Sequence, residues 1–111
     1  RFRSVYMQIQ VTSVESVGVA IRAMRKVNSI RQEDVPGVSH VFLRDLEKGK
    51  NTIQFGRVLK VLDELGIRVL LEVPDSQASA VKRAFEHFLP KSNMVLLSST
   101  ENKMIIKKVR E

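Results

Sequence analysis

The stretch "GVSHVFLRDLEKGKNT" occupies Gly37–Thr52 and decides the fold. Serine is a preferred residue at helix N-termini, so Ser39 is predicted to cap a helix. Gly49 is typical of the left-handed residue that ends one. Between them, Leu43 and Leu46 fall on one face, and the opposite face is polar and runs into a basic loop. The stretch therefore predicts a short helix over residues 40–48, capped at both ends, whose outward face is free to meet a partner.

Two elements precede this helix. Thr12–Glu15 ("TSVE") has the spacing of a capping box and predicts a helix over residues 14–28. Its apolar stripe at helical spacing is Val14, Val17, Ile21 and Met24. "IRQEDV" (residues 30–35) predicts one helical turn, which Pro36 must end because proline cannot continue the hydrogen-bond ladder. The turn and the helix after it have helix-turn-helix form.

After Gly49, Thr52 is predicted to cap a helix over residues 53–65 that ends at Gly66. Its predicted inward face is Phe55, Val58, Leu59 and Leu62. Alternating or apolar runs predict strands at residues 5–11, 67–73, 93–99 and 103–109, and helical spacing predicts a helix over residues 81–89. The predicted fold is therefore mainly α, a helix-turn-helix bundle with added β-strands and a C-terminal helix plus hairpin. The predicted domains are a helix-turn-helix domain with a C-terminal strand at residues 12–73 and an extension of unknown role, a helix plus two strands, at residues 75–111.

Composition narrows the function. The net charge of +7 over 111 residues favours a polyanion such as DNA, RNA or an acidic membrane surface, although a merely soluble basic protein fits the charge as well. The absence of cysteine excludes disulfides and thiolate metal sites. No apolar run approaches the ~18–20 residues of a membrane span. No nucleophile–base pair is recognisable, so we expect no enzyme, cofactor or metal, and a cytoplasmic location without membrane attachment.

In a helix-turn-helix motif the second helix lies in the major groove and its N-terminal residues meet base edges. Those positions here are Ser39, His40, Val41, Arg44 and Asp45. Three of them have a plainer interpretation: His40 as an exposed side chain, Arg44 as a solvated one, and Asp45 as the partner of a nearby lysine.

Two segments carry a family resemblance: "IRAMRKVNSIRQEDV" (residues 21–35) and "GVSHVFLRDLEKGKNTIQFGRVLKVLDELGIRV" (residues 37–69). Over Val14–Val73 the chain resembles the Cro/C1-type (xenobiotic-response-element) helix-turn-helix family, and within it the HipB-type antitoxins. The resemblance implies that the bundle is lambda-repressor-like and that residues 12–73 form a DNA-binding domain. The resemblance implies that Gln32 touches a phosphate and braces the recognition helix, and that an Arg25–Glu47 pair bridges two helices. It implies base-reading roles for Ser39, His40, Val41 and Asp45, and DNA-backbone contacts from Lys48, Lys50 and Asn51. The chain departs from the family at Pro36, which alone separates Val35 from Gly37, so the second helix is short by about one turn.

The resemblance also implies a homodimer on a palindromic operator of double-stranded DNA in its own promoter, and a HipA-like kinase toxin as partner. We therefore predict a DNA-binding repressor that is the antitoxin of a type II toxin–antitoxin system. Two alternatives stay open: a stand-alone or phage-type regulator without a toxin, and a protein-interaction module. The predicted dimer interface is one face of the strand at residues 67–73, made of Ile67, Val69, Leu71 and Val73.

Overall fold

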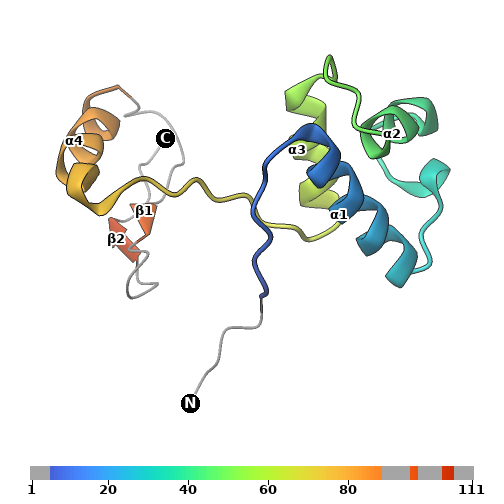
Figure 1. Cartoon of the computed structure of the whole chain (residues 1–111), viewed down its shortest axis with the longest axis horizontal. Helices are drawn as coiled ribbons and strands as arrows, with labels where there is room; N and C mark the ends of the chain where they lie inside the picture. Colours follow the sequence, from blue (N-terminus) through green and yellow to red (C-terminus); the bar gives the residue numbers. More distant parts are fainter. Residues whose placement is uncertain (1–5, 89–95, 98–103, 107–111) are drawn as a thin grey trace. The chain divides into compact units, whose positions relative to one another are not determined.

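The computed structural model describes residues 6–88, 96–97 and 104–106, and the chain divides into two compact units between Val69 and Leu70 (Figure 1). The first unit contains α1 (Val14–Val27), the 3₁₀ helix η1 (Gln32–Asp34), α2 (His40–Glu47) and α3 (Phe55–Glu64). The second contains the 3₁₀ helix η2 (Asp75–Gln77), α4 (Ala78–Phe88) and the short strands β1 (Leu96–Leu97) and β2 (Met104–Ile106).

The helix N-termini differ in how they are capped. Ser13, one residue after the predicted Thr12, begins α1: its hydroxyl accepts from the Ser16 amide at 3.1 Å, and the Ser16 hydroxyl accepts from the Ser13 amide at 3.2 Å. Ser39 caps α2 as predicted, with its Oγ 3.1 Å from the Phe42 amide nitrogen. The predicted cap at Thr52 is wrong, because α3 begins at Phe55 after an N-cap Gln54 that makes no side-chain cap bond.

The three helices of the first unit end in the same way. Each is followed by a residue with positive φ, namely Ser29 (57°), Gly49 (84°) and Gly66 (75°). At α2 the Gly49 amide donates to the Leu46 carbonyl at 3.0 Å and the Lys50 amide to the Asp45 carbonyl at 3.1 Å. This is the Schellman pattern, which satisfies carbonyls that the helix leaves unpaired. The predicted stops at Gly49 and Gly66 are confirmed.

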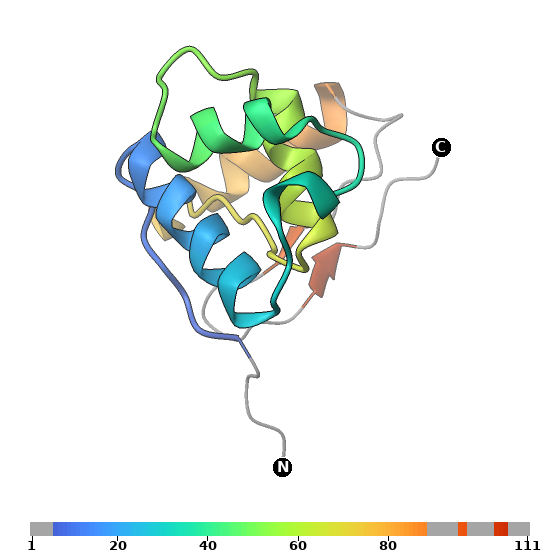
Figure 2. The ribbon, with the colours of Figure 1, turned by 90° about the vertical axis from the view of Figure 1, so that its right-hand side faces the viewer.

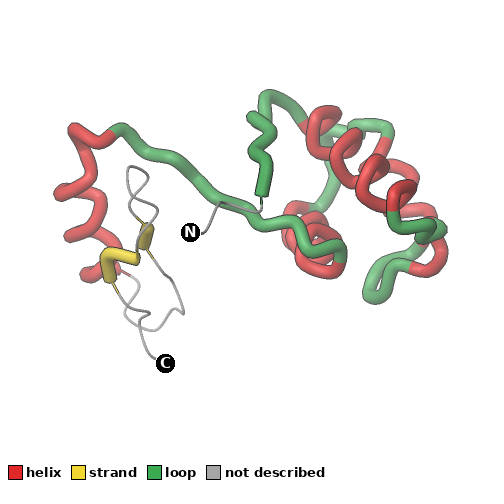
Figure 3. Tube along the Cα trace, turned by 90° about the horizontal axis from the view of Figure 1, so that it is seen from below, coloured by secondary structure: helices red, strands yellow, loops and turns green. Residues whose placement is uncertain are grey.

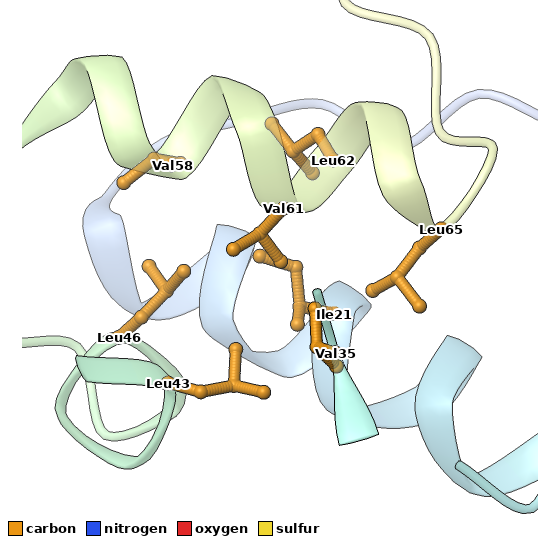
Figure 4. Packing of buried hydrophobic residues seen from close by; sticks show 8 residues of the cluster. All are labelled: Ile21, Val35, Leu43, Leu46, Val58, Val61, Leu62 and Leu65. Atoms are coloured by element: carbon orange, nitrogen blue, oxygen red, sulfur yellow. The ribbon is translucent and has the colours of Figure 1, made fainter. Parts of the chain in front are cut away.

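The core of the first unit gathers side chains from all three α-helices and from the turn after η1 (Figure 4). Its buried hydrophobic residues are Ile21, Val35, Leu43, Leu46, Val58, Val61, Leu62 and Leu65. The predicted inward face of α3 is partly wrong: Val58 and Leu62 are buried, but Phe55 is 67% exposed and Leu59 is also exposed. Val61 and Leu65 take their places, and Ile53, just before the helix, packs against the core.

In the part of the chain that the structure describes, the strands predicted at residues 5–11 and 67–73 are not found. Within residues 6–69 the first unit contains helices and loops, and residues 6–11 and 67–73 form neither helix nor strand (Figure 3). Alternation of apolar residues is only half of what a strand needs, because its backbone groups must also find a paired neighbour. Pairing in the described residues is confined to β1 and β2, which are antiparallel, with Leu96 opposite Ile106. The rest of the two predicted tail strands lies outside the described residues.

Candidate nucleic-acid interface

The exposed face of α2 begins at its N-terminus. The Ser39 side chain is fixed by its cap bond to Phe42. His40 and Val41 follow and are exposed, whereas Leu43 and Leu46, on the opposite side of the helix, are fully buried. A short helix anchored by two leucines and held by caps at both ends keeps a fixed orientation, so the positions of Ser39, His40 and Val41 are set by the core.

Further along α2, Arg44 is exposed and Asp45 forms an ion pair with Lys50. The Lys50 Nζ lies 3.6 Å from an Asp45 carboxylate oxygen, and both side chains reach solvent. An exposed pair of this kind contributes at most about 1 kcal/mol, so it can exchange partners at little cost. The plainer reading of Asp45, pairing with a nearby lysine, is the one that the structure contains.

The loop between α2 and α3 carries Lys48, Lys50 and Asn51, all exposed. It is fixed at both ends: the Schellman motif closes α2, and the Ile53 amide donates to the Lys50 carbonyl at 3.3 Å while its side chain packs on the core. The loop therefore presents two lysines and an amide from a defined backbone next to the exposed face of α2.

A buried ion pair joins α1 to α2. The Arg25 Nε and Nη2 donate to the two carboxylate oxygens of Glu47, each at 2.7 Å, and both side chains are almost wholly buried. These hydrogen bonds to the Glu47 carboxylate raise the pKa of Arg25 above its ordinary value. The Arg25 Nη1 donates to the Ile30 carbonyl at 3.0 Å, and Gln32 Nε2 donates to Glu47 at 3.1 Å. The predicted Arg25–Glu47 pair is confirmed, and Gln32 reaches the same carboxylate from η1.

A glycine that the sequence reasoning missed lets α1 and α2 approach closely. Gly18 is buried in α1, and a Cβ there would collide with the Leu46 carbonyl oxygen and lie 2.9 Å from that of Glu47. Glycine inside a helix normally signals weak helix formation, so only the contact itself reveals this role. The close approach brings the C-terminal end of α2 onto α1, where Arg25 meets Glu47.

A pocket of about 390 Å³ opens beside this ion pair, where α1, η1 and α2 meet. Figure 2 shows the three elements side by side. Six cationic side chains line the pocket: Arg22, Arg25, Lys26, Arg31, Arg44 and Lys48. Glu33, Glu47 and Gln32 complete the lining. The sequence reasoning had no role for Arg22 or Lys26, although their spacing of four residues on α1 places them on one face.

The residues predicted for a dimer interface have mixed surroundings. Ile67 packs against the core of the first unit, whereas Val69, Leu71 and Val73 are 48, 89 and 47% exposed. Arg68 lies between Ile67 and Val69 in the sequence, and its guanidinium is 4.6 Å from the centre of the Tyr6 ring. The four residues therefore share no strand face in this structure.

Among residues 6–88, 96–97 and 104–106, no group of three or more histidine, cysteine, aspartate or glutamate side chains is placed to hold a metal ion. Within the same part of the chain, no helix combines the length and apolarity needed to cross a bilayer.

Comparison with known proteins adds one relative. No family model matches the chain. The chain is similar to the HTH-type transcriptional regulator y4mF of Sinorhizobium fredii, with 38% identity over 71 residues. The match covers 93% of that protein and 61% of this chain.

Proposed function

The chain belongs to the family of HTH-type transcriptional regulators, and on this premise we propose that it is a sequence-specific DNA-binding repressor of the Cro/C1 type. The observation that carries the proposal is the exposed face of α2, which begins at the Ser39 cap and is continued by the basic loop at residues 48–51. A helix with a fixed orientation, flanked by cations, is what reading of bases in the major groove requires.

The residues that we propose to contact DNA fall into two groups, according to the part of the DNA that each group touches. We assign base edges to Ser39, His40, Val41 and Asp45, because they lie along the first turns of α2. We assign the phosphate backbone to Gln32, Arg44, Lys48, Lys50 and Asn51, whose side chains supply charge or amide donors. In this scheme the Asp45–Lys50 pair opens on binding, Lys50 turning to a phosphate and Asp45 to a base. The small energy of an exposed ion pair supports such an exchange.

We propose further that the repressor acts as a homodimer on a palindromic operator. Two recognition helices about 34 Å apart read two half-sites, which doubles the contacts. The exposed apolar side chains of Val69, Leu71 and Val73 support an interface at residues 67–73, since burial against a second copy would remove them from water.

The resemblance to HipB-type antitoxins supports a narrower role, in which the repressor controls its own operon in the cytoplasm and neutralises a HipA-like kinase toxin. The second unit, from Leu70 onward, supports this role as well. The relative in Sinorhizobium fredii is matched over 93% of its length yet leaves about two fifths of this chain unmatched. A unit additional to the one that contains the helix-turn-helix offers surface for a protein partner.

Gel shifts with two kinds of variant test the DNA-binding proposal. Lys50→Ala should weaken binding to promoter and random DNA equally and flatten the dependence of log K on log salt by about 0.9, the contribution of one phosphate. His40→Ala should instead change the preference among operator variants. Lys60→Ala removes the same charge from the exposed surface of α3 and is the matched control. The assignment is wrong if Lys50→Ala alters sequence preference while His40→Ala weakens all sequences equally.

A further inference from the structure

The pocket between α1, η1 and α2 carries more positive charge than the protein itself neutralises. Its six cationic side chains face two carboxylates, so the lining has a net charge of four. Arg25 donates two hydrogen bonds to Glu47, and Arg31 donates to Asp34 at 2.9 Å and lies 3.7 Å from Glu33. Four cations remain: Arg22, Lys26, Arg44 and Lys48.

These four side chains form two like-charged rows. Arg22 and Lys26 stand one turn apart on α1, and Arg44 and Lys48 one turn apart on α2. All four are exposed, and within the part of the chain described here the structure gives none of them an ion pair. Like charges four residues apart on a helix repel each other. An anion in the space between the rows would relieve this repulsion.

We propose that this pocket is a phosphate-binding site and that it holds the DNA backbone next to the bases read by α2, with Arg22 and Lys26 as its α1 contacts. The inference rests on the proposed function and adds α1 to the DNA-contacting surface. Two observations favour a DNA strand over a small polyanion. Arg44 and Lys48 belong both to the pocket and to α2, so the basic surface is continuous with the exposed helix face. The cations also form rows, which match a repeating chain of phosphates better than a single ion.

The test uses the full chain and the double variant Arg22→Gln/Lys26→Gln. Loss of two phosphate contacts should flatten the salt dependence of log K by about 1.8 and weaken binding about 30-fold at 0.15 M salt, equally for promoter and random DNA. The double variant Lys60→Gln/Arg83→Gln removes the same charge from exposed positions outside the pocket and should leave the slope within about 0.5 of the parent value. Because a like-charged row is removed, the first variant should melt at the same temperature as the parent or higher at low salt.

Each result decides between the proposals. A parent protein that binds neither promoter nor random DNA overturns the proposed function and this inference with it. A parent that binds, together with an Arg22→Gln/Lys26→Gln variant that keeps the parent's slope, overturns the inference alone. Calorimetry with sodium tripolyphosphate at constant ionic strength separates the two sources of phosphate. If tripolyphosphate binds saturably and one to one, and the variant loses this binding but keeps the parent's affinity for DNA, the ligand of the pocket is a small polyanion and the proposal of a DNA-backbone site is wrong.

Discussion

Ser29 occupies a position that favours glycine. Its φ of 57° lies in the left-handed region, where a Cβ is crowded by the backbone. It is held there by the Schellman bonds at the end of α1, with its own amide 3.1 Å from the Lys26 carbonyl and that of Ile30 2.9 Å from the Arg25 carbonyl. Gly66 has the same role after α3, with φ of 75° and open space where a Cβ would lie.

The two positions give opposite predictions. Ser29→Gly should raise the free energy of unfolding by about 0.5–1 kcal/mol, because it removes left-handed strain without changing a contact. Gly66→Ser should lower it by about 1 kcal/mol for the converse reason. Thermal unfolding of both variants measures the difference. If both substitutions changed the free energy of unfolding in the same direction, side-chain contacts and not backbone conformation would determine their effect.

At the residue scale, sequence reasoning succeeds where one residue type has one role. Ser39 and Gly49 have the chemistry of a helix cap and a helix stop, and both positions are confirmed. Gly18 has no such signature, because its importance lies in a carbonyl that belongs to a helix 28 residues away along the chain. Arg25 likewise falls outside the apolar stripe of α1, yet it is only 6% exposed because Glu47 and Ile30 satisfy its donors.

At the scale of elements, helical spacing alone fits two faces of α3. Residues 55, 58, 59 and 62 recur at helical spacing, and so do residues 58, 61, 62 and 65. The structure buries the second set, since α3 begins only at Phe55 and Ile53 covers the start of the core. Packing against α1 and α2 determines which face of α3 is buried, and the sequence of α3 alone does not reveal it.

The close contact between α1 and α2 predicts that a side chain at position 18 destabilises the protein. Gly18→Ala places a methyl group against the Leu46 and Glu47 carbonyl oxygens, so the helices must separate. We expect a loss of about 1–3 kcal/mol in the free energy of unfolding. Gly56→Ala, in α3, is the matched control: a Cβ there meets nothing within 4 Å, and the better helix former should add about 0.4–1 kcal/mol.

Chemical denaturation of the two alanine variants separates packing from helix propensity. A stabilised Gly18→Ala protein would contradict the close approach of α1 and α2. Because the same approach brings Arg25 to Glu47, a destabilised variant should also lose affinity for DNA if α2 is the recognition helix. Gly56→Ala should keep the parent's affinity.

For the whole molecule, the predicted strands at residues 5–11 and 67–73 show the limit of a local pattern. The alternation in both segments is clear, but a strand exists only with a neighbour, and the described parts of these segments have none. Their apolar side chains instead stay exposed: Met7, Ile9 and Val11 in the first segment, and Val69 and Leu71 in the second. Exposed apolar side chains of this kind indicate a surface that contacts another molecule. They are weaker evidence that the segment itself forms a strand.

A second copy of the chain is the partner that the proposed palindromic operator requires. The double variant Val69→Lys/Leu71→Lys should therefore be monomeric at micromolar concentration, because two lysines in the interface must be desolvated and face their symmetry mates. It should keep the helical signal of the first unit, since both side chains are exposed in the single chain. Binding to a full operator should fall steeply, while the weaker binding to a half-site persists.

The control for this prediction is Val19→Lys/Val27→Lys, which places the same charges at two exposed valines of α1. Sedimentation velocity should give a dimer for this variant and for the parent protein. A parent that sediments as a monomer at micromolar concentration, or a Val69→Lys/Leu71→Lys variant that stays dimeric, would refute the proposed interface. In the first case a single α2 would have to supply all the base contacts. Operator occupancy at low protein concentration would then rise with the first power of the monomer concentration, where a dissociating dimer gives the second power.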